Sequence, residues 1–316
     1  MTCTKANMLL LLAALIWGIS NVAQKTVLDH LGPLSVNGLK SLIAVCVIAP
    51  YFWRQLCGGS FKRALTSGPA IMAAICFVGG TTAMQIGFGA TTVVNASLLV
   101  NTATIITPAV AWIISGSRPA GVVWVAAVLA LAAIRLMGGS GFSLLGWGDA
   151  MCLVSAVCFA LWFVYLGKFL QSGGDPAAIT VLQLMLAGVV CCAAGVVFEP
   201  LTLPGLLAGL PELVVLGVLS SGVAYLLQAI AQKHTAAAAA AIIVSAEAVF
   251  GALSGVILLG EVLTLPIVSG IALFFVAVVL VQLPVNLRFG EGRQPIGSVP
   301  DLGRRLQPMT IPDREG

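Results

Sequence analysis

The sequence predicts an all-α polytopic membrane protein, with ten transmembrane helices arranged as two inverted five-helix repeats. Three observations predict this fold: the composition, ten apolar windows, and an internal similarity at one constant offset. Of the 316 residues, 59% are hydrophobic and 8% are charged, whereas soluble domains carry about 25% charged residues. The mean hydropathy is +1.09. A chain of this composition is expected to have the lipid bilayer as its surroundings.

Apolar windows of about 20 residues, separated by Gly, Pro and charged clusters, predict the helices, because about 20 residues of helix cross the hydrocarbon core. Several windows begin with a hydroxyl residue two positions before a proline, as at Ser67 and Pro69, which is typical of a helix start. The predicted helices cover residues 8–27, 34–53, 69–89, 92–115, 120–137, 146–166, 177–197, 210–230, 236–259 and 264–285. The first window lacks a small-residue cleavage site and continues through Trp17 to Lys25, so it is expected to be a retained span.

The placement of the basic residues predicts the orientation. With a cytoplasmic N-terminus, twelve of the fifteen Lys and Arg residues fall on the inner side, and Lys25 and Arg135 fall outside. Lys40 lies within the second span. Basic residues gather on the cytoplasmic side of membrane proteins. We therefore expect a multi-pass protein of the cell (inner or plasma) membrane with both termini in the cytoplasm.

A shift of 143 residues aligns the two halves of the chain. Because each half holds five predicted spans, the second half enters the membrane from the opposite side, which makes the halves an inverted repeat. The predicted domains are 1–142, 143–285 and a cytoplasmic tail, 286–316, whose Gly, Pro and Arg content predicts disorder. The aligned identities are Pro33 with Pro176, Gly79 with Gly222, Gln85 with Gln228, Thr92 with Thr235, and Ala96 with Ala239.

The sequence carries little that indicates an enzyme. Gly138, Ser140 and Gly141 spell GxSG, which resembles the nucleophile motif of rhomboid proteases, but His30 and His234 are the only histidines and neither is placed to act as its base. There is no HExxH motif, no phosphate-binding Gly-rich loop and no pair of intramembrane Asp residues. The eight cysteines form no CxxC and are expected to be core residues. We predict no enzyme activity, no cofactor, no metal and no nucleic-acid binding; the oligomeric state is not indicated.

Glu247 lies at the midpoint of the apolar window 236–259. An ionisable group in a bilayer is costly, so such residues usually face a bundle interior or a wet cavity and are functional-site candidates. The helical positions around it hold small residues, among them Ala240 and Gly251. The alternative is a protonated Glu247 that hydrogen-bonds a neighbouring helix.

Other polar and aromatic side chains inside spans complete a candidate site for a small-molecule substrate. Trp17 and Asn21 share one helical face, and Asn101 lies at the depth of Glu247, with which it forms the preferred central pair. Each of these side chains has a packing role as its alternative. The candidate substrate-binding residues are Glu247, Asn101, Trp17, Asn21, Trp162, Gln85 and Gln228.

Lys40 is the other charge deep within a span, about 9 Å from the outer end by helical rise. Its long stem is expected to carry the ammonium to the outer surface, in preference to a salt bridge with Glu247.

Several motifs resemble the ten-span drug/metabolite transporter superfamily, in particular its EamA-type members. The segment LLGEVLT, Leu258 to Thr264, followed by Gly270, is similar to that family's loop between the last two helices. Trp17 with Gly18 resembles its first-helix WG, and Pro108 its fourth-helix proline. The resemblance covers about residues 8–285. It implies a central cavity enclosed by both halves and passage of a small metabolite by alternating access, with amino-acid export a common activity.

The sequence also departs from relatives of this family. The first-half counterpart of LLGE is IISGSRP, which places Arg118 where the repeat has a glutamate, and the first helix lacks the glutamate that small multidrug proteins use for proton exchange. Sugar-phosphate carriers need cavity cations, for which Lys40 is the one candidate. We therefore expect a secondary transporter or facilitator for a small polar or zwitterionic metabolite, with amino-acid export favoured. The alternatives are transport of nucleotide sugars or cationic drugs, or a membrane scaffold that transports nothing.

Overall fold

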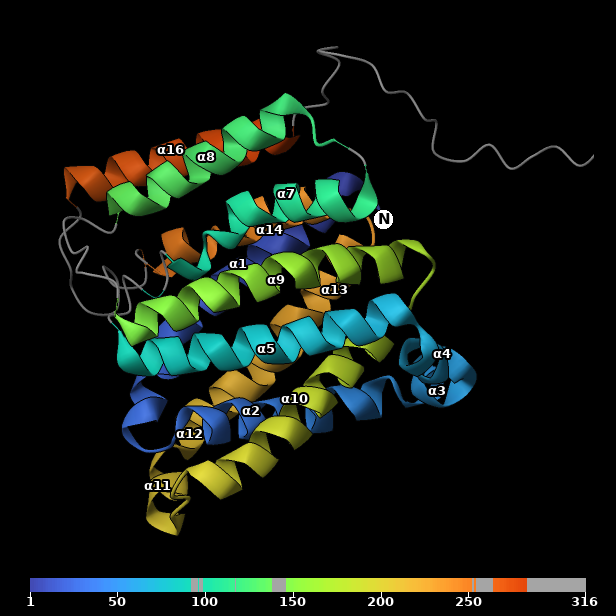
Figure 1. Ribbon diagram of the computed structural model, residues 1–316, viewed down its shortest axis with the longest axis vertical. Coiled ribbons are helices and arrows are strands. Elements are labelled where there is room, and N and C mark those ends of the chain that lie inside the picture. The colour runs from blue at the N-terminus through green and yellow to red at the C-terminus, as the bar shows by residue number, and fades with distance from the viewer. Residues whose placement is uncertain are drawn as a thin grey trace, which may run out of the picture. The chain divides into compact units, whose positions relative to one another are not determined.

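The computed structural model describes residues 1–91, 96, 99–116, 118–137, 146–251, 253 and 264–282. These residues belong to one compact unit, Met1–Pro284, and in the described ranges every regular element is a helix. The long helices run alongside one another (Figure 1). Three features singled out from the sequence lie outside the described residues: the GxSG serine Ser140, most of the LLGEVLT segment, and the tail 286–316.

The first half of the unit contains five apolar helices: α1 (Cys3–Thr26), α2 (Pro33–Tyr51), α5 (Gly68–Ala90), α7 (Ala103–Ser115) and α8 (Gly121–Met137). The turn η1 (Val27–Asp29) follows α1. The short elements α3 (Trp53–Gln55), η2 (Leu56–Ser60) and α4 (Phe61–Thr66) connect α2 to α5. Proline occupies the first turn of α5, as predicted, and also that of α2, although the Ser67 hydroxyl makes no capping hydrogen bond.

The second half begins with α9 (Trp147–Gln171) and α10 (Pro176–Phe198), followed by the short α11 (Leu203–Ala208). The next span is built from α12 (Leu210–Val215), the π-helical segment η3 (Leu216–Ala224) and α13 (Tyr225–Gln232). The last two described helices are α14 (Ala237–Val244) and α16 (Leu265–Gln282).

In the described residues, six helices are long and apolar enough to cross a membrane, and four more are apolar but shorter. The prediction of an all-helical polytopic membrane protein is therefore confirmed in its general form. The four shorter helices cover Ala103–Ser115, Gly121–Leu136, Ala237–Gly251 and Leu265–Leu280.

Most of the extensive helix contacts join the first half of the chain to the second. The helix α5 packs along α9, α2 along α10, and α8 along α16, while α1 contacts η3, α13 and α14. Figure 1 shows α8 beside α16 and α5 beside α9. The two halves therefore pack against each other along most of their helices.

Two helical spans are interrupted at their middles, where the sequence predicted continuous helices. A turn at Asn101 and Thr102 precedes α7, and a turn at Ser245 and Ala246 follows α14. The Thr102 hydroxyl donates to the Leu99 carbonyl at 2.6 Å. The Ser245 hydroxyl donates to the carbonyl three residues before it at 2.7 Å. Hydroxyl groups can compete for helical carbonyls in this way and bend the helix.

Candidate functional site

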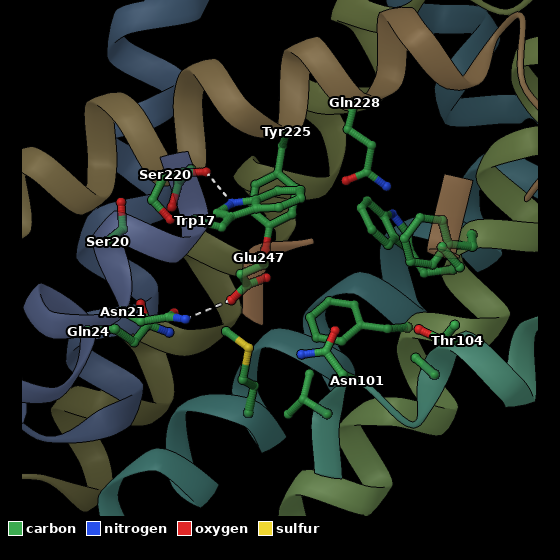
Figure 2. A pocket seen from close by; sticks show the side chains of 18 of the residues that line it. Trp17, Ser20, Asn21, Gln24, Asn101, Thr104, Ser220, Tyr225, Gln228 and Glu247 are labelled. Atoms are coloured by element: carbon green, nitrogen blue, oxygen red, sulfur yellow. Dashed lines mark hydrogen bonds between the residues drawn. The ribbon is translucent and has the colours of Figure 1, made fainter. Parts of the chain in front are cut away.

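A pocket lies between the two halves, with walls formed by α1, α2, α5, α7 and α9 together with η3, α13, α14 and the segment that follows α14 (Figure 2). The cavity volume of the pocket is about 80 Å³, which is smaller than the sites that hold drug-sized ligands. Its polar and charged lining residues are Ser20, Asn21, Gln24, Lys40, Asn101, Thr104, Ser220, Ser221, Gln228 and Glu247.

Glu247 is half-buried and lies directly after the turn at Ser245 and Ala246. Asn21 donates from Nδ2 to Glu247 Oε1 at 3.0 Å, and Figure 2 shows this bond crossing from α1 to Glu247. The carboxyl is therefore held by the first half of the chain although it belongs to the second. Because it faces the pocket, it can accept further hydrogen bonds from a donor or a cation.

Lys40 does not reach the outer surface, so the expectation of a snorkelling side chain is wrong. The residue is 4% exposed. Its Nζ donates to Gln24 Oε1 and to Gln85 Oε1, both at 3.1 Å. Two amide oxygens from neighbouring helices replace water around the ammonium, which removes the need for the stem to extend outward.

Aromatic rings close one side of the pocket. The Tyr225 ring lies 4.9 Å from Trp17, 4.8 Å from Phe77 and 5.7 Å from Trp162, measured between ring centroids. The indole of Trp17 donates to the Ser220 carbonyl at 2.9 Å, and that of Trp162 donates to Gln183 Oε1 at 2.9 Å. The rings thus pack against one another, with the two indole nitrogens bonded to neighbouring helices, and form an apolar wall.

The structure brings six of the seven candidate residues to this pocket: Glu247, Asn101, Trp17, Asn21, Trp162 and Gln228. Gln85 is not part of the lining and lies behind Lys40, whose ammonium it binds. Asn101 and Glu247 both line the pocket, and the hydrogen bond to the Glu247 carboxylate comes from Asn21.

Gln228 points its amide into the pocket (Figure 2). Its Nε2 donates to Gln232 Oε1 at 3.4 Å. Its Oε1 is buried and accepts no hydrogen bond from the described residues. A buried acceptor of this kind is costly unless it is paired, so this oxygen is available to a donor on a ligand.

Sequence reasoning missed several contributors to the pocket, of which Lys40, Tyr225 and the two serines of η3 are the most informative. Lys40 was expected at the surface, while Tyr225 and the Ser220–Ser221 pair were not singled out. Tyr225 lies three residues before Gln228, which places both on one helical face. That spacing was the available signal for Tyr225. The serines are positioned by the π-helical segment, which no apolar window reveals.

Comparison with known proteins agrees with this architecture. The model of the EamA-like transporter family matches residues 4–139 and 146–283. An uncharacterized transporter of Archaeoglobus fulgidus is 28% identical over 286 residues, covering 89% of this chain and 86% of the relative. The uncharacterized transporter YwfM of Bacillus subtilis is 24% identical over 287 residues, covering 87% of this chain and 93% of that protein.

A solved crystal structure is similar with a TM-score of 0.74, covering 88% of this chain and 96% of the other, at 15% sequence identity. That likeness shows a shared fold. The family match extends over both halves of the chain and confirms the resemblance indicated by Trp17, Gly18 and Pro108. This chain is a member of the EamA-like transporter family, and thus a membrane transporter of the drug/metabolite transporter superfamily.

Proposed function

We propose that the protein is a secondary transporter or facilitator that moves a small polar or zwitterionic metabolite through the pocket between its halves, with export of an amino acid favoured. One observation carries the proposal: Asn21 of α1 binds Glu247 of the second half inside the pocket at 3.0 Å. Polar groups that face a cavity within the membrane mark substrate and ion pathways. We propose no enzyme activity for the chain.

The proposed topology has ten crossings in two inverted repeats, 1–142 and 143–285. The six long and four shorter apolar helices support this number. The helix contacts also support it, because they repeat when each helix is exchanged for its counterpart in the other half. The packing of α5 on α9 corresponds to that of α1 on η3 and α13, and α7 on α9 corresponds to α1 on α14.

The proposed transport mechanism is alternating access. Thr102 and Ser245 lie 143 residues apart, at equivalent positions of the repeats, and each interrupts its span beside the pocket. Interrupted helices at corresponding positions of two halves are typical of transporter binding sites. Bending at these turns would open the pocket first on one face of the membrane and then on the other.

Three alternatives remain to be separated by experiment. A cationic drug is a second candidate substrate, because a carboxyl beside the Trp17 and Tyr225 rings would suit an organic cation. A nucleotide sugar has less support, since the described lining offers its charged phosphates one cation, Lys40, together with the acidic Glu247. A scaffold without a transport cycle would have no use for a polar pocket within the bundle.

The test is flux into and out of liposomes containing the purified protein, measured with amino acids, nucleosides, nucleotide sugars and cationic drugs. We expect flux that depends on the substrate and on the protein. In the Glu247→Gln variant the flux should fall roughly tenfold or more, because the substituted amide carries no charge. Absence of flux with every compound would contradict transport. Unchanged flux of Glu247→Gln at every pH would exclude Glu247 from the mechanism.

A further inference from the structure

We infer that Lys40 is the anion-binding residue of the pocket and stands opposite Glu247, so that the metabolite is a zwitterion with its carboxylate at Lys40 and its ammonium at Glu247. This inference rests on the proposed function, since it names the substrate class of the same pocket. It assigns to the second-span lysine a specific role in selecting the substrate.

The charges of the lining support this assignment. Lys40 and Glu247 are its one basic and one acidic residue among the described side chains. They do not form an ion pair with each other in the described structure: the ammonium is bound by Gln24 and Gln85, and the carboxylate by Asn21. The pocket therefore has a positive group, the Lys40 ammonium, and a negative group, the Glu247 carboxylate, that are not paired with each other.

The residues that hold the two charges lie close together on one helix. Asn21 holds the acid and Gln24 holds the base, and these two residues are three positions apart on α1. That separation is about 4.5 Å along the helix axis. Asn21 and Gln24 are thus neighbours on one helix, so a small zwitterion bound between the two charges would lie against α1.

Lys40 also has capacity for an anion. An ammonium has three N–H donors, and the described hydrogen bonds to Gln24 and Gln85 use two of them. Both acceptors are neutral amide oxygens. A buried cation without a counter-charge is costly, and a substrate carboxylate would supply the missing charge on binding.

The other half of the chain shows that the fold itself does not need a cation here. The position equivalent to Lys40, 143 residues later, is Gln183, which is fully buried. There the amide oxygen accepts from the Trp162 indole. An uncharged side chain thus fills the same place in the repeat, so the charge of Lys40 serves a purpose other than helix packing.

The test compares three probes of one carbon skeleton on the purified wild-type protein: L-leucine, isoamylamine, which lacks the carboxylate, and isocaproate, which lacks the ammonium. The apolar lining residues Met84, Val100 and Phe159 suit this skeleton. Binding is measured by calorimetry and by the rise in unfolding temperature that a ligand causes. We expect leucine to bind roughly tenfold or more tighter than either single-charge probe, since each lost pairing removes a charge-assisted hydrogen bond.

Variants of Lys40 then test whether this residue binds the carboxylate end of leucine. Lys40→Gln, which copies the residue of the other half, should weaken leucine binding roughly tenfold and leave isoamylamine binding within about twofold. Lys40→Arg keeps the charge and should retain part of the leucine affinity. The matched control is Lys25→Gln, because Lys25 binds the Phe88 carbonyl at 2.7 Å and is not part of the lining.

Three results would overturn the inference: equal binding of isoamylamine and leucine by the wild type, unchanged leucine binding by Lys40→Gln, or no binding of leucine. Any of these leaves the proposed transport function standing if flux of another polar metabolite depends on Glu247. Loss of all flux with intact leucine binding would instead contradict the transport function. The wild-type comparison of three probes decides the substrate class even if Lys40→Gln fails to fold.

Discussion

The indole nitrogen of Trp17 lies 2.9 Å from the carbonyl oxygen of Ser220, and this hydrogen bond ties α1 of the first half to the π-helical segment η3 of the second. Both residues line the pocket. Turns with π-helical spacing occur frequently at functional sites. The bond therefore fixes one wall of the pocket at the point where the two halves meet.

Replacing Trp17 with Phe keeps an aromatic ring against Tyr225 and removes the donor. We expect the free energy of unfolding to fall by about 1 kcal/mol, because the buried Ser220 carbonyl loses a hydrogen-bond partner. Denaturant titration in detergent micelles measures it. Trp147→Phe is the matched control, since Trp147 is 69% exposed and should change stability by less than about 0.5 kcal/mol. Equal effects of the two substitutions would show that the indole bond adds no stability.

Gly18 is needed where α1 crosses the segment that carries Glu247. A Cβ atom at Gly18 would lie 2.7 Å from Phe250 Cβ and 2.8 Å from the Glu247 carbonyl oxygen. We expect Gly18→Ala to push the two segments apart, to cost about 1–3 kcal/mol of stability, and to reduce flux with it. Gly68→Ala is the control, because a Cβ there meets nothing within 4 Å. Wild-type stability and flux in Gly18→Ala would refute this explanation of the WG pair.

The turns at Thr102 and Ser245 should set the rate of transport and have little influence on affinity. Ser245→Ala removes the hydroxyl bond to the Ile242 carbonyl and favours a continuous helix. Since conformational steps often limit turnover, we expect flux to fall about tenfold while substrate affinity changes by less than about twofold. Thr102→Val should act in the same direction. Ser269→Ala, which removes a similar hydroxyl bond from the exposed face of α16, is the control.

A parallel fall in flux and affinity in Ser245→Ala would contradict this assignment, since it would place the hydroxyl in substrate binding. Flux at the wild-type rate would show that the interruption has no part in the cycle. Flux in liposomes and calorimetric binding, measured on the same preparation, distinguish these outcomes.

The sequence predicted the helices well because apolar character accumulates over a whole window. It did not predict the interruptions, since Ser and Thr are common in continuous helices, and whether a hydroxyl such as that of Ser245 captures a carbonyl depends on local geometry. The interpretation of η3 as ordinary helix failed for a similar reason, because hydropathy does not distinguish π from α spacing.

The sequence predicted the role of a residue where its position along the membrane span is decisive. It did not predict the role where the direction of the side chain is decisive. Glu247 lies in the middle of its span in any register, so it was bound to face a neighbour or a cavity. Lys40 was placed at the right depth but given the wrong direction, because Gln24 and Gln85, which hold its ammonium, come from two other helices. Contacts of that kind require the packed structure.

The proposed orientation makes a prediction about Cys57, which lies exposed in η2 between α2 and α5. Ten crossings with a cytoplasmic N-terminus place this segment in the cytoplasm. In a variant whose other seven of eight cysteines are replaced by serine, a membrane-impermeant maleimide should label inside-out vesicles and spare intact cells. Leu203→Cys in the same background, with Cys57 also replaced, is the control. Leu203 is 68% exposed and lies on the proposed outer side, so intact cells should be labelled. The reverse labelling pattern would invert the topology, and labelling of both sites from one side would rule out the spans assigned between them.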